Sequence, residues 1–215
     1  MKKAYLFLIV LSIAASGKGQ QLYLEAFPAI SRTSYGTDMF SAKKNYLTAG
    51  ARLAAGSDHF QIGGEYRTDL TKPSFESGTA TLAFKETFYG GFLRYKIARY
   101  PAMRMGLVLK AGAGVFNTTV ERDAGGVQEF TYDPIVGVNG GAGISIPLTR
   151  PFMIEIGYSY IYQKRPALAT VPVPAHTASY HLFSAGLSLN FVFGKRKKEY
   201  DRIRQNSRFQ NGWRG

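Results

Sequence analysis

Residues 152–162 read "FMIEIGYSYIY", and this stretch alternates between two kinds of side chain. Every second residue from Phe152 to Tyr162 is large and apolar or aromatic, whereas Glu155, Gly157 and Ser159 lie between them. A period of two is the pattern of a β-strand whose two faces meet different surroundings. The stretch therefore predicts a strand with one apolar face and one face of mainly small or polar side chains.

Seven more segments repeat this alternation, with turn residues between them. The eight expected strands cover residues 21–30, 45–56, 60–68, 84–98, 103–115, 134–146, 152–162 and 184–193. Pro28 in the first segment lacks an N–H donor, which indicates a bulge or a strand end. In 84–98 we assign Tyr89 to the outer face, but Phe88 and Phe92 then fall on the inner one, so a second phase stays open.

The connections between these segments alternate in length. Short ones are expected at 56–58, 98–102 and 147–151, and long polar ones at 31–44, 69–81, 118–132 and 164–178. This alternation is typical of an eight-stranded up-and-down β-barrel in an outer membrane, with the long loops outside. A lipocalin-like soluble barrel is the alternative, but its apolar face would line the interior. Small and charged residues on the polar face suit a narrow lumen and favour the membrane barrel.

The last strand, "LFSAGLSLNFVF" (182–193), ends in two aromatics separated by one residue. With the strand count and the loop alternation, it resembles the small outer-membrane barrels related to OmpA, OmpX and OmpW over residues 20–193. The resemblance implies an all-β transmembrane barrel whose last strand is read by the barrel assembly machinery. That family includes adhesins, anchors, secretion-machinery parts, small-molecule conduits and a few lipid A-modifying enzymes, so it specifies architecture rather than function.

The polar face collects seven charged residues that we expect inside the barrel as an ion-paired network. They are Glu25, Arg52, Glu65, Arg67, Arg94, Lys110 and Glu155. An unpaired charge in so narrow an interior would be expensive, so the charges must pair. A plug is the expected result, with a narrow gated conduit as the alternative. The glycines of "GVNGGAG" (137–143) precede no helix and no Gly-Lys-Ser/Thr, so we expect them to give side chains room inside the barrel rather than bind a nucleotide.

Aromatic residues on the apolar face gather near the strand ends, where membrane interfaces place them. The girdle expected at the short-turn, periplasmic end is Phe60, Phe152, Phe191 and Phe193. The girdle expected at the long-loop, outer end is Tyr66, Tyr160, Tyr162 and Tyr180.

Catalytic and metal chemistry have little support in the sequence. The chain has no cysteine, which excludes disulfides and thiol chemistry, and its three histidines, His59, His176 and His181, are scattered. His181 lies two residues from Ser179, and lipid A-modifying barrels do use Ser, His and an acid. No trusted spacing supports such a site, so we expect no catalytic residue, no metal and no cofactor. The loop acids Asp123, Glu129 and Asp133 also lack a recognised calcium spacing.

Both ends of the chain are basic. Lys2 and Lys3 precede an apolar stretch at 4–15, too short to span a bilayer, and a cut is expected before Gln20 or after Ser16. The expected domains are a cleaved secretory signal at 1–19, the barrel at 20–193 and a basic periplasmic tail at 194–215. The signal carries +3 and the tail +6 (8 − 2) of the net charge of +13, which leaves +4 for the barrel (13 − 3 − 6). The high charge therefore gives no argument for nucleic acid.

The tail after Phe193 is longer and more basic than a strand end requires. Its expected contacts to a partner or an anionic group are Lys195, Arg196, Lys197, Lys198, Arg202, Arg204 and Trp213. The tail could simply hold the strand end at the headgroups, bind anionic lipid, or dock to a periplasmic protein or peptidoglycan.

Taken together, these patterns favour a non-enzymatic structural or interaction component of the envelope, with a role as an accessory of a secretion or transfer machine. It would lie in the outer membrane of a Gram-negative-type envelope among lipid and lipopolysaccharide, with both mature termini in the periplasm. A conduit or small-ligand binder is the first alternative, and a lipid A-modifying enzyme is the second.

Overall fold

The chain forms ten β-strands in the computed structural model, which describes residues 21–35, 43–57, 59–77, 80–100, 105–149, 151–168 and 173–192. The strands are β1 Gln21–Tyr35, β2 Lys44–Gly56, β3 Phe60–Asp69, β4 Ser74–Ser77, β5 Ala80–Tyr100, β6 Met105–Asp123, β7 Val127–Thr131, β8 Ile135–Pro147, β9 Phe152–Arg165 and β10 His176–Val192. The expected signal (1–19) and tail (194–215) lie outside the described residues.

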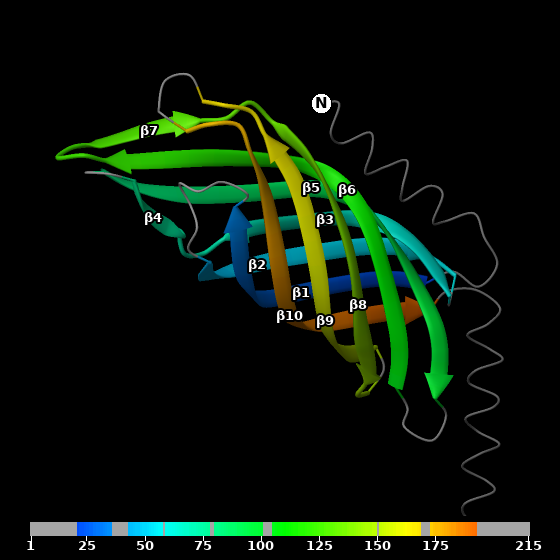
Figure 1. Ribbon diagram of the computed structural model, residues 1–215. Helices are drawn as coiled ribbons and strands as arrows, with labels where there is room; N and C mark the ends of the chain where they lie inside the picture. Colours follow the sequence, from blue (N-terminus) through cyan, green and yellow to red (C-terminus); the bar gives the residue numbers. More distant parts are fainter. Residues whose placement is uncertain are drawn as a thin grey trace, which may run out of the picture.

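Eight of these strands close into an antiparallel barrel in the order β1-β2-β3-β5-β6-β8-β9-β10, and β10 pairs back to β1 (Figure 1). Each barrel strand pairs with the barrel strands before and after it in the chain, which makes the topology up-and-down. Closure satisfies the backbone donors and acceptors along both sides of every barrel strand, as a membrane-spanning sheet requires. The all-β, eight-stranded architecture expected from the sequence is confirmed.

The barrel is apolar outside and polar inside. In β1, Glu25 is 3% exposed, whereas Leu24 and Ile30 on the opposite face are 40% and 54% exposed. Large apolar side chains on the other barrel strands are exposed in the same way. Contact between such an apolar surface and water is unfavourable, whereas contact with the hydrocarbon of a membrane is favourable. Among the described residues, no helix is long and apolar enough to cross a membrane.

The prediction of a bulge or a strand end at Pro28 is wrong. Strand β1 continues through this residue to Tyr35, and Pro28 pairs with Ala49 of β2 without any shift of register. On the other side, pairing with β10 resumes at Ala29 in the register it had before Pro28. The missing N–H therefore interrupts one ladder locally and leaves the strand intact.

Strands occupy much of the long polar connections expected at 69–81 and 118–132, and strands β1, β9 and β10 extend into those expected at 31–44 and 164–178. β4 pairs with β5 and β7 pairs with β6, while both long strands run well past the apolar band. Alternation continues there in the opposite sense, because Leu82, Phe84 and Val120 are buried on the inner face whereas Thr81 and Lys85 are exposed on the outer one. The result is a four-stranded sheet of β4, residues 80–87 of β5, residues 117–123 of β6, and β7, which we call the projecting sheet (left side of Figure 1).

Candidate functional site

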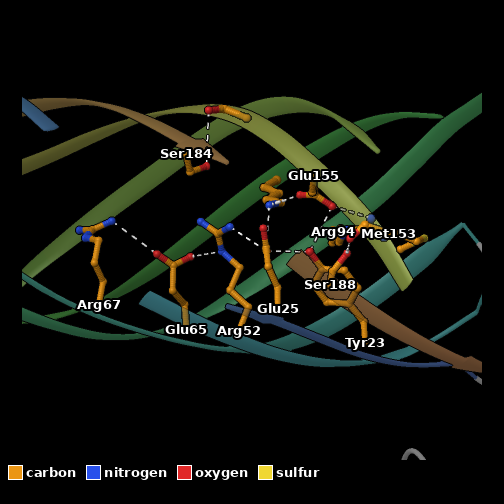
Figure 2. Close-up of polar contacts among 12 residues, drawn as sticks. Tyr23, Glu25, Arg52, Glu65, Arg67, Arg94, Met153, Glu155, Ser184 and Ser188 are labelled. Carbon is orange, nitrogen blue, oxygen red and sulfur yellow. Dashed lines mark hydrogen bonds and ion pairs between the residues drawn. The ribbon is translucent and has the colours of Figure 1, made fainter. Parts of the chain in front are cut away.

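All seven charged residues expected inside the barrel lie there and form one chain of contacts (Figure 2). On one side of the lumen, Arg52 donates from Nε to Oε2 of Glu65 at 2.8 Å and from Nη1 to Oε2 of Glu25 at 2.9 Å. Arg67 reaches Oε1 of Glu65 at 3.4 Å. Direct neighbours on β1, β2 and β3 supply this run, because Glu25 pairs with Arg52 and Arg52 pairs with Glu65.

Glu155 of β9 joins this run to the opposite wall. It accepts from Nη2 of Arg94 at 2.8 Å and pairs with Lys110, whose Nζ also lies 3.6 Å from Glu25. Arg94 and Lys110 are cross-strand neighbours, so two like charges lie side by side and share one carboxylate. Such a pair is stable in a buried site only because the anion lies between them.

Tyr23 and Gln61 extend the network beyond the expected members. The hydroxyl of Tyr23 lies 2.6 Å from Oε2 of Glu25 and 3.1 Å from Oε2 of Glu155, and Gln61 accepts from Arg94 at 2.9 Å. The inward direction of Tyr23 could have been predicted from the sequence, because a residue two positions before Glu25 in a strand lies on the same face.

Aromatic rings fill the lumen next to the charged network. The guanidinium carbon of Arg52 lies 4.0 Å from the ring centre of Phe27, and that of Arg67 lies 4.9 Å from Phe88 and 5.7 Å from Phe116. Inward-facing glycines make this possible, since a Cβ at Gly114 would come within 2.5 Å of the Phe88 ring. In the stretch 137–143, a Cβ at Gly137 would likewise come within 2.6 Å of the Phe116 ring, so glycine on the inward face gives side chains room inside the barrel, as expected.

A second polar cluster lies where the projecting sheet joins the barrel, and it includes Glu86 and Thr118 of that sheet. Glu86 of β5 pairs with Arg165 of β9 and accepts from the Tyr180 hydroxyl at 2.7 Å. Gln163 donates to the same hydroxyl at 2.6 Å and Thr118 to Glu86 at 3.4 Å. The sequence analysis missed Glu86, whose strand had an open phase, and Arg165, which fell in an expected loop.

The outer girdle needs one correction, because Tyr180 lies inside the barrel and is 2% exposed. Alternation in β10 runs unbroken from the apolar face of Leu187 and Phe183, so residue 180 must face inward. The other expected girdle residues that the structure describes face outward. They are Tyr66, Tyr160 and Tyr162 at one end of the barrel, and Phe60, Phe152 and Phe191 at the other. Phe193 lies outside the described residues, as do all seven expected contact residues of the tail.

The three histidines do not form a catalytic constellation. His59 lies by the β2–β3 turn, His176 bonds through Nδ1 to the Pro174 carbonyl at 2.8 Å, and His181 faces outward. The nucleophile candidate Ser179 donates to the Ser34 carbonyl at 3.4 Å. In the described ranges, no three His, Asp or Glu side chains are grouped so that they could hold a metal ion.

Comparison with known proteins finds no matching family model and no matching curated protein. Solved structures do match. Neisserial surface protein A (NspA) has 17% identity and a TM-score of 0.57, with 79% of this chain and 97% of that chain covered. Ail, the attachment invasion locus protein of Yersinia pestis, in complex with the heparin analogue sucrose octasulfate, has 15% identity and a TM-score of 0.52, with 81% and 100% covered. The chain therefore has the fold of the small eight-stranded outer-membrane β-barrels.

Proposed function

We propose that this chain is a non-enzymatic outer-membrane protein whose barrel anchors the projecting sheet, and that the sheet contacts a partner at the cell surface. The observation that carries the proposal is a paired, four-stranded sheet standing on a barrel whose interior is filled. A filled interior suits an anchor, and strands that continue beyond the apolar band need another purpose.

The edges of the projecting sheet offer the means of contact. Within the described residues, β4 pairs only with β5 and β7 pairs only with β6, so each has one open side. An open strand edge carries backbone donors and acceptors that can pair with an extended segment of another molecule. Val127 at the start of β7 is 71% exposed and would lie beside such a segment.

The filled lumen argues against the conduit and ligand-binding alternatives. Seven charged side chains and three phenylalanines occupy it, and Phe27, Phe88 and Phe116 are each at most 2% exposed. The lipid A-modifying alternative has weaker support still. Neither of its candidates, Ser179 and His181, has a hydrogen bond or ion pair to an acid among the described residues.

The membrane placement is proposed from the same features. With the long hairpins outside, the short turns and both mature ends lie in the periplasm, and the aromatic-ended last strand engages the assembly machinery during biogenesis. The basic tail at 194–215 would then dock a periplasmic partner or peptidoglycan, which would suit an accessory of a secretion or transfer machine. Deleting residues 195–215 tests this: sedimentation with purified peptidoglycan and cross-linking to periplasmic proteins should both fall, and unchanged values would leave the tail as a simple strand end.

Surface attachment tests the main proposal. A trimmed variant replaces residues 74–82 and 120–130 with two-residue Asn-Gly turns, which removes β4, nearly all of β7 and the outer parts of β5 and β6, and keeps the barrel. Cells that display the wild-type chain should attach several-fold better than trimmed cells to surfaces coated with heparin or with extracellular-matrix protein. Heparin is included because Ail was crystallised with a heparin analogue.

The matched control shortens the β9–β10 connection at 166–175 and should attach like the wild type. The heat-dependent shift of folded barrels in gel electrophoresis confirms that each variant is folded. Equal attachment by wild-type and trimmed cells on both surfaces would refute the proposal.

A further inference from the structure

The outer face of β2, β1, β10 and β9 changes abruptly from apolar to polar between two neighbouring rows of side chains. The last apolar row, joined by direct strand pairing, is Leu47, Ile30, Phe183 and Tyr158. Two residues further along each strand lies the row that we call the boundary row: Asn45, Arg32, His181 and Tyr160. The two rows are roughly 7 Å apart, so the boundary row lies at the level of lipid headgroups.

Hydrogen-bond donors converge in the boundary row. Arg32 and His181 are direct cross-strand neighbours. The imidazole is held by Tyr158, whose hydroxyl lies 2.8 Å from Nδ1, and its ring meets that of Tyr160 edge-on at 5.4 Å. When Tyr158 donates to Nδ1, the proton of the neutral imidazole is on Nε2, which leaves this N–H available as a donor on the same outward face as the cross-strand neighbour Arg32. Arg32 is exposed, and its guanidinium makes no hydrogen bond or ion pair with another side chain among the described residues.

This side of the barrel carries cations without acids. Alternation places no Asp or Glu on the outward face of β1, β2, β9 or β10, and Lys164 adds a further exposed cation above the boundary row. The opposite wall differs, since its first polar row holds the hydroxyls of Thr68 and Thr87, 3.3 Å apart. Charge appears above them, where Lys85 is exposed on β5 and Lys72 is paired with Glu121.

We propose that Arg32 and His181 form a binding site for a phosphate of the lipid A-type glycolipid in the outer leaflet. A guanidinium presents two parallel N–H groups to a phosphate, and Nε2 of the imidazole supplies a third donor beside them. The acyl chains of the same lipid lie against Ile30 and Phe183, directly below. The inference rests on the outer-membrane placement proposed above but is independent of any partner bound by the projecting sheet.

Native mass spectrometry of the detergent-released barrel tests the site with three probes: diphosphorylated lipid A, enzymatically dephosphorylated lipid A and phosphatidylglycerol. The wild-type chain should retain one diphosphorylated lipid A at concentrations at which the other two lipids do not bind. Arg32→Gln combined with His181→Gln should weaken this binding at least tenfold. Lys85→Gln, which removes the same charge from the outward face of β5, should leave it unchanged.

Three outcomes would overturn the proposal: equal binding of dephosphorylated lipid A, equal binding of phosphatidylglycerol, or full binding by the double variant. The comparison of phosphorylated with dephosphorylated lipid uses only the wild-type protein, so it decides the matter even if the double variant folds poorly. Surface attachment is measured on the same proteins. Lost lipid binding with normal attachment would concern only this site, whereas normal lipid binding without attachment would refute only the proposed surface function.

Discussion

Arg52 and Glu65 lie side by side on β2 and β3, with Nε of the arginine 2.8 Å from Oε2 of the glutamate and both side chains almost fully buried. Because Arg52 also holds Glu25, it bridges two buried carboxylates.

Replacing Arg52 by Met should therefore take from Glu25 and Glu65 their closest cation, leaving only the longer contacts with Lys110 and Arg67. The free energy of unfolding should fall by about 3–5 kcal/mol. Urea unfolding from lipid vesicles measures this change. Adding Glu65→Gln to Arg52→Met should recover part of the loss, since one buried charge disappears. A loss below about 1 kcal/mol for the single variant would mean that water reaches the network freely.

Two neighbouring glycines of β8 test whether small residues are needed inside the barrel. A Cβ at Gly141, on the inward face, would lie 2.4 Å from the carbonyl oxygen of Tyr158, whereas nothing lies within 4 Å of a Cβ at Gly140, on the outward face. Gly141→Ala should destabilise the barrel by about 1–3 kcal/mol, and Gly140→Ala should be neutral or slightly stabilising. Equal unfolding midpoints for the two variants would contradict the steric role of the inner glycines.

Tyr180 should behave as an interior residue rather than as part of a membrane girdle. Tyr180→Phe removes the hydroxyl that Glu86 and Gln163 share, so it should cost about 1–3 kcal/mol of unfolding free energy. The matched substitution Tyr162→Phe, on the outward face of β9, should change the stability by less than about 0.5 kcal/mol. The reverse ranking would restore Tyr180 to the outer girdle.

The filled lumen predicts that the barrel does not conduct ions. Purified protein in planar bilayers should show no reproducible unitary current above that of detergent alone. Arg67 helps to close the lumen, because it is a member of the charged network and also lies against the rings of Phe88 and Phe116. If even the wild-type protein gave stable, uniform current steps, the conduit interpretation would replace the anchor.

His176, at the outer end of β10, predicts a pH dependence of the local structure. Burial lowers the pKa of this imidazole and the nearby Arg165 acts in the same direction, while the hydrogen bond to the Pro174 carbonyl opposes them. Because the folded pKa lies below the unfolded value of about 6.5, folding stability is highest above that pH and falls as the pH drops through the folded pKa.

Hydrogen exchange of the amides at 173–178 measures this effect, and exchange in the wild type should quicken relative to His176→Gln as the pH falls below about 6.5. The tyrosine ring of Tyr35, 5.5 Å from the imidazole ring, gains no charge in this range, so it adds no pH dependence of its own. Identical pH profiles for the two proteins would show that His176 is already solvated in the folded state.

Much of the site could be predicted from the alternation of side-chain direction along each strand. The alternation around Glu155 or Arg52 says which way a side chain points, and the seven charges expected inside do lie together. The same alternation predicts the inward direction of Tyr180, because the outward-facing apolar residues of β10 are at odd-numbered positions. The phase of 84–98 could not be settled in this way, because aromatics occur on both faces. Tyr89 is exposed to the outside, while Phe88 and Phe92 are buried in a lumen that accepts rings as well as charges.

The sequence by itself determined that the chain is an inside-out barrel of eight strands, because the direction of each side chain depends only on its neighbours along the strand. Tertiary structure decided which charges meet, since pairing register sets Arg94 beside Lys110 and brings Glu155 across the lumen to both. It also decided how far the strands continue, because β4 and β7 keep pairing where the apolar residues face inward and the outer face is polar. Local alternation records contact with lipid, whereas register and strand length are settled by the partner strands.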